Sequence, residues 1–170
     1  MSSAVGSPRN RLTFLVQGEL FGCLVLPVTV FSLATAFDTL PGPLAWFSLA
    51  VVGFLLLQGA AFGLLKLKDL GDHGRRMAAA VAWFRRAKWL NLALLGLLGG
   101  LVAARGLQPT GQDFDFWTGL VLATLAALEQ VNYYHWQLMH DTPQEWRDLL
   151  RRKRLKRGLL ARELGRPRVR

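Results

Sequence analysis

The stretch from Leu44 to Leu65 reads "LAWFSLAVVGFLLLQGAAFGLL" and holds no charged residue. A helix needs about 20 mostly apolar residues to cross roughly 30 Å of hydrocarbon, because backbone amides in lipid must be satisfied within the helix. This stretch meets that requirement, and Gln58 is the only amide side chain that it carries. The sequence therefore predicts a transmembrane helix here.

Three further segments resemble this stretch, namely Leu12 to Phe37, Trp89 to Ala104 and Phe116 to Met139. Of the 170 residues, 52% are hydrophobic and 19% are charged, which is typical of membrane proteins. The third segment is short, and we expect Gly74 to Ala87 to form an amphipathic helix at the membrane interface, either separate from that span or continuous with it. We predict an all-α membrane protein with four transmembrane helices in a bundle.

The sequence is expected to form a transmembrane domain, residues 1–140, followed by a basic cytoplasmic tail, residues 141–170. The net charge is +10, and the basic residues gather between the second and third spans and in the tail. The other two loops, "DTLPGP" and "RGLQPTGQDFD", carry one arginine and three aspartates. Because basic loops are retained in the cytoplasm, we predict a protein of the plasma (inner) membrane with both termini cytoplasmic.

The tail begins with "DTPQEW", in which Thr142, Pro143 and Glu145 form a helix-start pattern. A helix is expected over about residues 143–164, before Gly165 and Pro167. Basic side chains beside a span typically meet anionic headgroups. The expected lipid or partner contacts are Arg85, Arg86, Lys88, Arg151, Arg152, Lys153, Arg154, Lys156 and Arg157. An RNA role is disfavoured because no RNA-binding motif accompanies these charges.

Polar residues recur at one depth of the predicted bundle. Glu19 lies seven residues inside Leu12, Gln58 seven before Leu65 and Glu129 seven before Trp136, so we expect all three about 10 Å below the surface, and Asn91 enters near that level. Glu129 shares a helical stripe with Asn132, Tyr133, Trp136 and His140. Buried carboxyl groups are costly, so Glu19 and Glu129 are expected to be neutral or hydrogen-bonded. The layer serves either as interhelical glue or as a functional pocket, and Tyr133 and Trp136 also fit an aromatic belt.

Small residues at GxxxG spacing let helix backbones approach closely in lipid. Three predicted spans carry such a pair: Gly18 and Gly22, Gly59 and Gly63, Gly96 and Gly100. The first two pairs lie at equal depth beside the polar layer. We therefore expect the first and second spans to pack there, with Glu19 near Gln58.

Catalytic and metal-binding patterns are not found in the sequence. The single cysteine, Cys23, permits no intrachain disulfide or cysteine-based metal cluster. His135 and His140 are out of phase on a helix and make a poor joint metal site. The loop "KDLGDHGRR" from Lys68 lacks the phosphate-binding glycine patterns. No catalytic residue, metal or cofactor is predicted.

The favoured function is therefore that of a small, non-enzymatic membrane accessory or interaction protein. Its basic face would contact anionic lipid, a membrane protein partner or a second copy of the chain. The alternative is a small oligomeric transporter that couples to protons or cations through Glu19 and Glu129. A third and weaker hypothesis is a lipid-modifying enzyme with Glu129, Tyr133 and His140 as acid or base groups.

Overall fold

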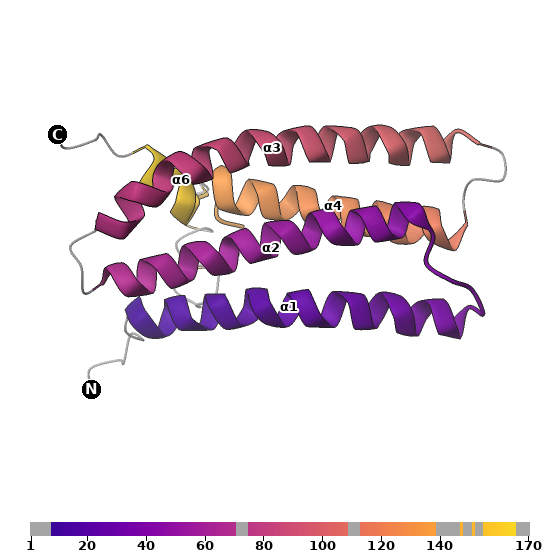
Figure 1. The fold of residues 1–170 in the computed structure, drawn as a ribbon, viewed down its shortest axis with the longest axis horizontal. Coiled ribbons are helices and arrows are strands. Elements are labelled where there is room, and N and C mark those ends of the chain that lie inside the picture. Colours follow the sequence, from indigo (N-terminus) through magenta and orange to yellow (C-terminus); the bar gives the residue numbers. More distant parts are fainter. Residues whose placement is uncertain are drawn as a thin grey trace.

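The structure, a computed structural model, describes residues 8–70, 75–108, 113–138, 147, 151 and 155–165. Across these residues the fold is helical and contains no β-strand, which confirms the predicted all-α class. Four long helices lie side by side, and a short helix packs at one end of them (Figure 1). They are α1 (Pro8–Ala36), α2 (Pro43–Asp69), α3 (Arg75–Gly106), α4 (Phe114–Tyr134) and the short α6 (Leu159–Leu164).

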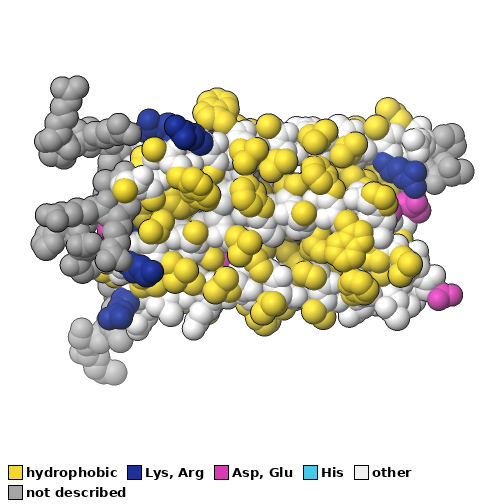
Figure 2. All heavy atoms as spheres, in the orientation of Figure 1, with side chains coloured by type: hydrophobic (Ala, Val, Ile, Leu, Met, Phe, Trp, Pro, Cys, Tyr) yellow, Lys and Arg dark blue, Asp and Glu magenta, His cyan; other side chains and the backbone are white. Residues whose placement is uncertain are grey.

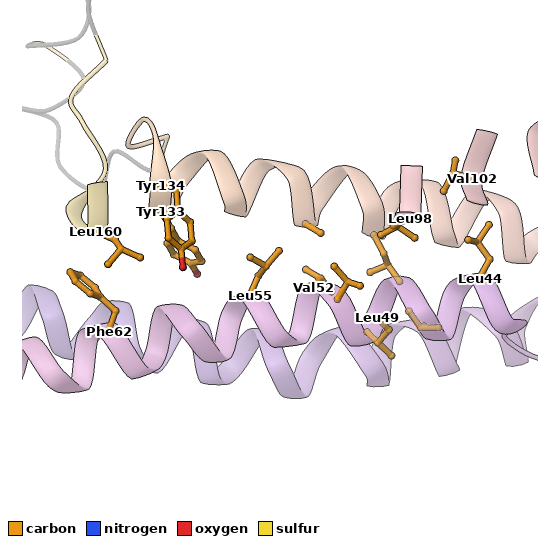
Figure 3. Packing of buried hydrophobic residues seen from close by; sticks show 14 of the residues in the cluster. Leu44, Leu49, Val52, Leu55, Phe62, Leu98, Val102, Tyr133, Tyr134 and Leu160 are labelled. Atoms are coloured by element: carbon orange, nitrogen blue, oxygen red, sulfur yellow. The ribbon is translucent and has the colours of Figure 1, made fainter. Parts of the chain in front are cut away.

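Helix α2 is the central element, because it packs against α1, α3 and α4. It is also the most buried of the apolar helices: 61% of its most apolar window is buried, against 17% for α1 and 22% for α3. Helix α4 packs on α2 and α3. The most charge-free stretch of the sequence thus lies at the centre of the fold (Figure 3).

The outer surface of the long helices is apolar. Large hydrophobic side chains such as Phe14, Phe21, Leu24, Trp89 and Leu101 are exposed, and Figure 2 shows hydrophobic side chains over the whole length of the helices, with charged groups near the two ends. Within the described ranges three helices are long and apolar enough to cross a membrane: Arg9–Ala36, Pro43–Asp69 and Ala79–Gly106. The surface and these helices indicate association with a membrane.

A separate interfacial helix before the third predicted span is not observed. Helix α3 runs without a break from Arg75 to Gly106 and passes through Arg85, Arg86 and Lys88. Alanine, arginine, lysine and leucine are strong helix formers, and the segment between Arg75 and Lys88 contains no glycine or proline. The interface helix and the third span are therefore one element.

The fourth predicted span and the tail helix also end differently from the prediction. Helix α4 ends at Tyr134 instead of Met139, so Trp136 does not continue the stripe of Glu129; His140 lies outside the described residues. Trp136 forms an isolated antiparallel β-bridge with Arg157. On either side of it, the Gln137 amide donates to the Lys156 carbonyl at 2.9 Å, and the Gly158 amide donates to the His135 carbonyl at 3.1 Å. Residues 155–158 are thus non-helical, and one continuous helix over 143–164 is wrong.

Gly158 explains why the tail turns here. A Cβ at this position would lie 2.6 Å from the backbone oxygen of Asn132 and 2.7 Å from that of Tyr133, so only glycine permits this close approach. Beyond it, Leu160 of α6 is buried near Phe62 of α2 (Figure 3), and the Lys66 ammonium pairs with the Glu163 carboxylate. These contacts hold α6 against the end of the long helices where α1 begins (Figure 1).

At the opposite end, aspartates of the last loop organise two helix starts. Asp115 accepts hydrogen bonds from the amides of Ala45 at 2.7 Å and Leu44 at 3.3 Å, so it caps α2 from the first turn of α4. Asp113 caps its own helix by accepting from the Phe116 amide at 3.0 Å, and it pairs with Arg105 at 2.7 Å. The Phe116 amide, with help from Arg105, lowers the pKa of Asp113 below its ordinary value.

The cap that Asp115 supplies predicts a measurable loss of stability on its removal. In Asp115→Ala, two amides at the start of α2 lose their carboxylate acceptor, and we expect the free energy of unfolding to fall by about 1 kcal/mol. Asp38→Asn removes an exposed carboxylate at the same end and is expected to have little effect. Thermal unfolding in mild detergent compares the two variants, and equal midpoints for both would contradict the cap.

Candidate functional site

The amide side chains inside the fold form one closed network. Gln58 of α2 and Asn91 of α3 exchange two hydrogen bonds, from Gln58 Nε2 to Asn91 Oδ1 at 2.9 Å and from Asn91 Nδ2 to Gln58 Oε1 at 3.0 Å. Asn91 Nδ2 also donates to Gln130 Oε1 of α4 at 3.1 Å, and the Tyr134 hydroxyl donates to Gln58 Oε1 at 3.0 Å. The network therefore joins α2, α3 and α4.

This network is sealed from its surroundings. Asn91 is 1% exposed, and Gln58 and Gln130 are 3% exposed. Their amides use one another as donors and acceptors, and Gln130 Nε2 makes a longer bond of 3.5 Å to the backbone oxygen of Lys88. A buried amide left without a partner costs about 1–3 kcal/mol, so mutual satisfaction makes this group a stabilising link between three helices.

A second polar group lies on the other side of α2. Glu19 of α1, Glu129 and Tyr133 of α4 surround Gly59, where an added Cβ would lie 3.0 Å from the Glu19 carboxyl carbon and would collide with the Tyr133 hydroxyl. Glu129 interacts electrostatically with both Glu19 and Tyr133. The absence of a side chain at Gly59 is what lets these polar groups meet against α2.

This second group lines a pocket of about 290 Å³. The pocket lies among α1, α2 and α4 and is closed at one end by α6. Most of its wall is apolar, with Phe14, Leu26, Leu56, Phe62 and Leu125 among the lining side chains. Pockets that bind small molecules show this combination of an apolar wall and a few convergent polar groups.

The polar groups of the pocket are incompletely satisfied. The Tyr133 hydroxyl is buried beside the Glu19 and Glu129 carboxyl groups and interacts with both, but neither contact has the geometry of a full hydrogen bond. Glu129 receives one long contact, 3.5 Å from Asn132 Nδ2. The side-chain oxygen of Asn132 accepts a hydrogen bond of 2.9 Å from the Leu138 amide, just beyond the end of α4. The pocket is thus polar and open, whereas the amide network is polar and closed.

The predicted polar layer is consequently two groups instead of one. Gln58 and Asn91 belong to the amide network, and Glu19, Glu129, Asn132 and Tyr133 belong to the pocket. Gln58 lines the pocket as well, but its hydrogen bonds run to Asn91 and Tyr134 and not to Glu19. Helices α2 and α4 contribute side chains to both groups.

The glycine pairs divide in a similar way. Gly22, Gly59 and Gly63 lie at close contacts: a Cβ at Gly22 would be 3.2 Å from Leu56, and one at Gly63 would be 2.5 Å from Val16. Helices α1 and α2 therefore lie close together at Gly22, Gly59 and Gly63. Gly18, Gly96 and Gly100 have nothing within 4 Å among the described atoms. Gly18 lines the pocket, and the other two lie on the outer face of α3.

The predicted lipid contacts lie at the end of the molecule where α1 begins, so far as they are described. Arg85, Arg86, Arg151, Lys156 and Arg157 are exposed, and Lys88 is half-buried. Arg152, Lys153 and Arg154 lie outside the described residues.

Two members of the amide network were not chosen from the sequence. They are Gln130, which is adjacent to Glu129, and Tyr134, which is adjacent to Tyr133. The signal that distinguishes them is their helical phase, because Gln130 and Tyr134 are four residues apart and share one face of α4. That face meets α2 and α3, whereas Glu129 and Tyr133 face α1 and α2.

Neither a search for metal-binding clusters nor comparison with known proteins assigns a function to the chain. In the part of the chain that the structure describes, no group of three or more histidine, cysteine, aspartate or glutamate residues is placed to hold a metal ion. Comparison of the chain with protein-family models, curated proteins and solved structures finds no match.

The reciprocal bonds between Gln58 and Asn91 predict energetic coupling. In a double-mutant cycle with Gln58→Leu and Asn91→Leu, each single variant strands the other amide, whereas the double variant strands neither within the pair. We expect a coupling energy of about 1 kcal/mol in unfolding experiments, within the range of hydrogen bonds between membrane helices. The matched control pairs Asn91→Leu with Thr124→Val, an exposed residue that bonds only its own helix; that pair should be additive, and additivity in both cycles would contradict the link.

Proposed function

We propose that the chain is an integral membrane protein with four spans, both termini cytoplasmic, and that it acts without catalysis as an accessory or interaction protein. The observation that carries this proposal is the separation of charge between the two ends of an apolar molecule (Figure 2). Basic side chains gather at the end with the start of α1: Arg9, Arg11, Lys66, Lys68, Arg85, Arg86, Lys88, Lys156, Arg157 and Arg162. Asp38, Asp113, Asp115 and Arg105 lie at the other end.

The fourth span is argued from length and burial. Helix α4 has 21 residues, enough to cover about 30 Å. Its last turns carry polar residues, of which Gln130, Tyr133 and Tyr134 are buried against other helices. A helix whose polar groups face protein remains compatible with surrounding lipid.

The basic end would meet the anionic leaflet. Each lysine or arginine near such a surface contributes about 1 kcal/mol of attraction, and the described ones include exposed side chains of α3 and of the tail segment. The same charges set the orientation, since basic loops stay in the cytoplasm. This proposal places the plasma (inner) membrane around the helices and the α1 start and α6 on its cytoplasmic side.

Orientation is tested by cysteine labelling in intact bacterial cells, in a Cys23→Ala background. Leu40→Cys and Leu107→Cys, at the less basic end, should react with a membrane-impermeant maleimide from outside. Lys68→Cys and Arg157→Cys should react only after the cells are permeabilised. All four native side chains are exposed. Labelling of Arg157→Cys from outside would show that α4 does not cross the membrane, and labelling of Lys68→Cys would reverse the orientation.

An accessory role requires a surface for another membrane helix. Gly96, Gly99 and Gly100 lie exposed on α3, and a Cβ at each would meet nothing within 4 Å among the described residues. A face of small residues suits close packing of helices in lipid. For the accessory role the partner is a different membrane protein; self-association of the chain through the same face is the alternative.

Native mass spectrometry after gentle purification from the original membrane tests the accessory role. We expect a second protein at fixed stoichiometry, and Gly96→Leu with Gly100→Leu should weaken its retention. Gly18→Leu is the matched control, because it changes a glycine of α1 away from this face. Recovery of the chain alone or only with itself would contradict the accessory role.

Transport is the second candidate, because Glu19 and Glu129 share one pocket with Tyr133. Paired carboxyl groups in a membrane interior are typical of proton-coupled transport. Ion-coupled flux in reconstituted vesicles that is abolished by Glu129→Gln, with the variant still folded, would favour this function over the accessory role.

A further inference from the structure

The pocket among α1, α2 and α4 has no role in the accessory function, and its walls and polar groups define a ligand. Its volume of about 290 Å³ is near the lower end of the range for small-molecule sites, roughly 300–1,000 Å³. The apolar side chains come from four elements, including Leu26 of α1, Leu56 of α2, Leu125 of α4 and Leu160 of α6. Such walls suit a hydrocarbon chain or ring.

Two carboxyl groups, those of Glu19 and Glu129, lie among the polar groups of the pocket. Glu19 is 7% exposed, and its carboxyl group interacts with the Tyr133 hydroxyl and with the Glu129 carboxyl group. The Glu129 carboxyl group interacts with the side chains of Asn132 and Tyr133. None of these is basic. Arg11 also lines the pocket, but it stands about two helical turns from Glu19 along α1.

Tyr133 lies where a ligand in the pocket would meet the two carboxyl groups. Its side chain is 8% exposed, it lines the pocket, and its hydroxyl has no aligned hydrogen bond to the described residues. A ligand that brings hydrogen-bond donors to this point would satisfy the hydroxyl oxygen together with the two carboxyl groups.

We propose that this pocket binds a lipophilic molecule that carries a protonated amine. The ammonium lies between the Glu19 and Glu129 carboxyl groups and the Tyr133 hydroxyl, and the hydrocarbon lies along the apolar wall. An ammonium offers several N–H donors and a positive charge, so its bonds to carboxylates are charge-assisted.

Other ligand classes fit the pocket less well. An anionic ligand would be repelled by two carboxyl groups, and a neutral hydrocarbon would leave the polar groups without partners. A calcium ion takes six to eight oxygen ligands, and the described residues hold no group of three or more acidic or metal-binding side chains at one place. The amine comes either from a free amphiphile or from the headgroup of an aminophospholipid, which share this chemistry.

The binding test uses the full chain in phosphatidylcholine nanodiscs, with decylammonium as the probe and decanol as the neutral molecule of similar shape. Isothermal titration, corrected with empty nanodiscs, should show saturable binding of one decylammonium per chain and none for decanol. Glu19→Gln and Glu129→Gln should each weaken binding about tenfold or more, because each removes a charged acceptor. Asp38→Asn, which removes a carboxylate at the opposite end, should bind as the original chain does.

A second variant separates loss of the site from loss of the fold. Gly18 lines the pocket, and a Cβ there meets nothing within 4 Å in the described structure. Gly18→Leu should therefore fill the pocket and block decylammonium with its unfolding midpoint unchanged. Unaltered binding to Gly18→Leu, to Glu19→Gln with Glu129→Gln, or equal binding of decanol would overturn the proposal.

The lipid composition of the nanodiscs distinguishes a lipid headgroup from a free amphiphile as the source of the amine. If nanodiscs with phosphatidylethanolamine reduce decylammonium binding to the original chain, the site takes a lipid headgroup. If binding is unchanged, the site takes a free amphiphilic amine. The site does not require a protein partner, so a chain purified without one leaves this test intact.

Discussion

The reciprocal pair between Gln58 and Asn91 is the interaction on which the arrangement of the helices depends. In a chain whose outer surface is apolar, packing among helices gains little from the hydrophobic effect once lipid surrounds them. Polar side chains then matter more, because an amide has no alternative partner outside the protein. By bonding Asn91 to both Gln58 and Gln130, the network fixes the rotation of α2, α3 and α4 about their axes.

The rotation of α4 determines which of its side chains point toward α1. With Gln130 and Tyr134 directed to the network, Glu129 and Tyr133 are directed toward α1, where Glu19 enters above Gly59. Helix α1 meets α2 through the small residues Gly22, Gly59 and Gly63 but stands apart from α4, and the pocket occupies the space between them. The closed network and the open pocket are thus two consequences of one helix packing.

The sequence was sufficient for the all-helical class and for the apolar helices, because these depend on composition and on hydrophobic patterning. It was insufficient for helical phase between elements. Nothing local distinguishes Glu129 from Gln130, and only the positions of α1 and α3 assign one to the pocket and the other to the network. The continuous tail helix failed for a similar reason, because the contact of Gly158 with the carbonyls of Asn132 and Tyr133 joins residues far apart in sequence.

The division of the buried polar residues into a structural network and a binding pocket is tested most directly by one comparison of unfolding free energies in nanodiscs. One variant replaces the carboxyl groups, Glu19→Gln with Glu129→Gln; the other breaks the network at its most bonded residue with Asn91→Ala. The account predicts that Asn91→Ala lowers the unfolding free energy by about 1–3 kcal/mol, since it strands Gln58 and Gln130, and that the carboxyl variant unfolds no more easily than the original chain. A carboxyl variant destabilised as strongly as Asn91→Ala would contradict it, because Glu19 and Glu129 would then be structural links as well.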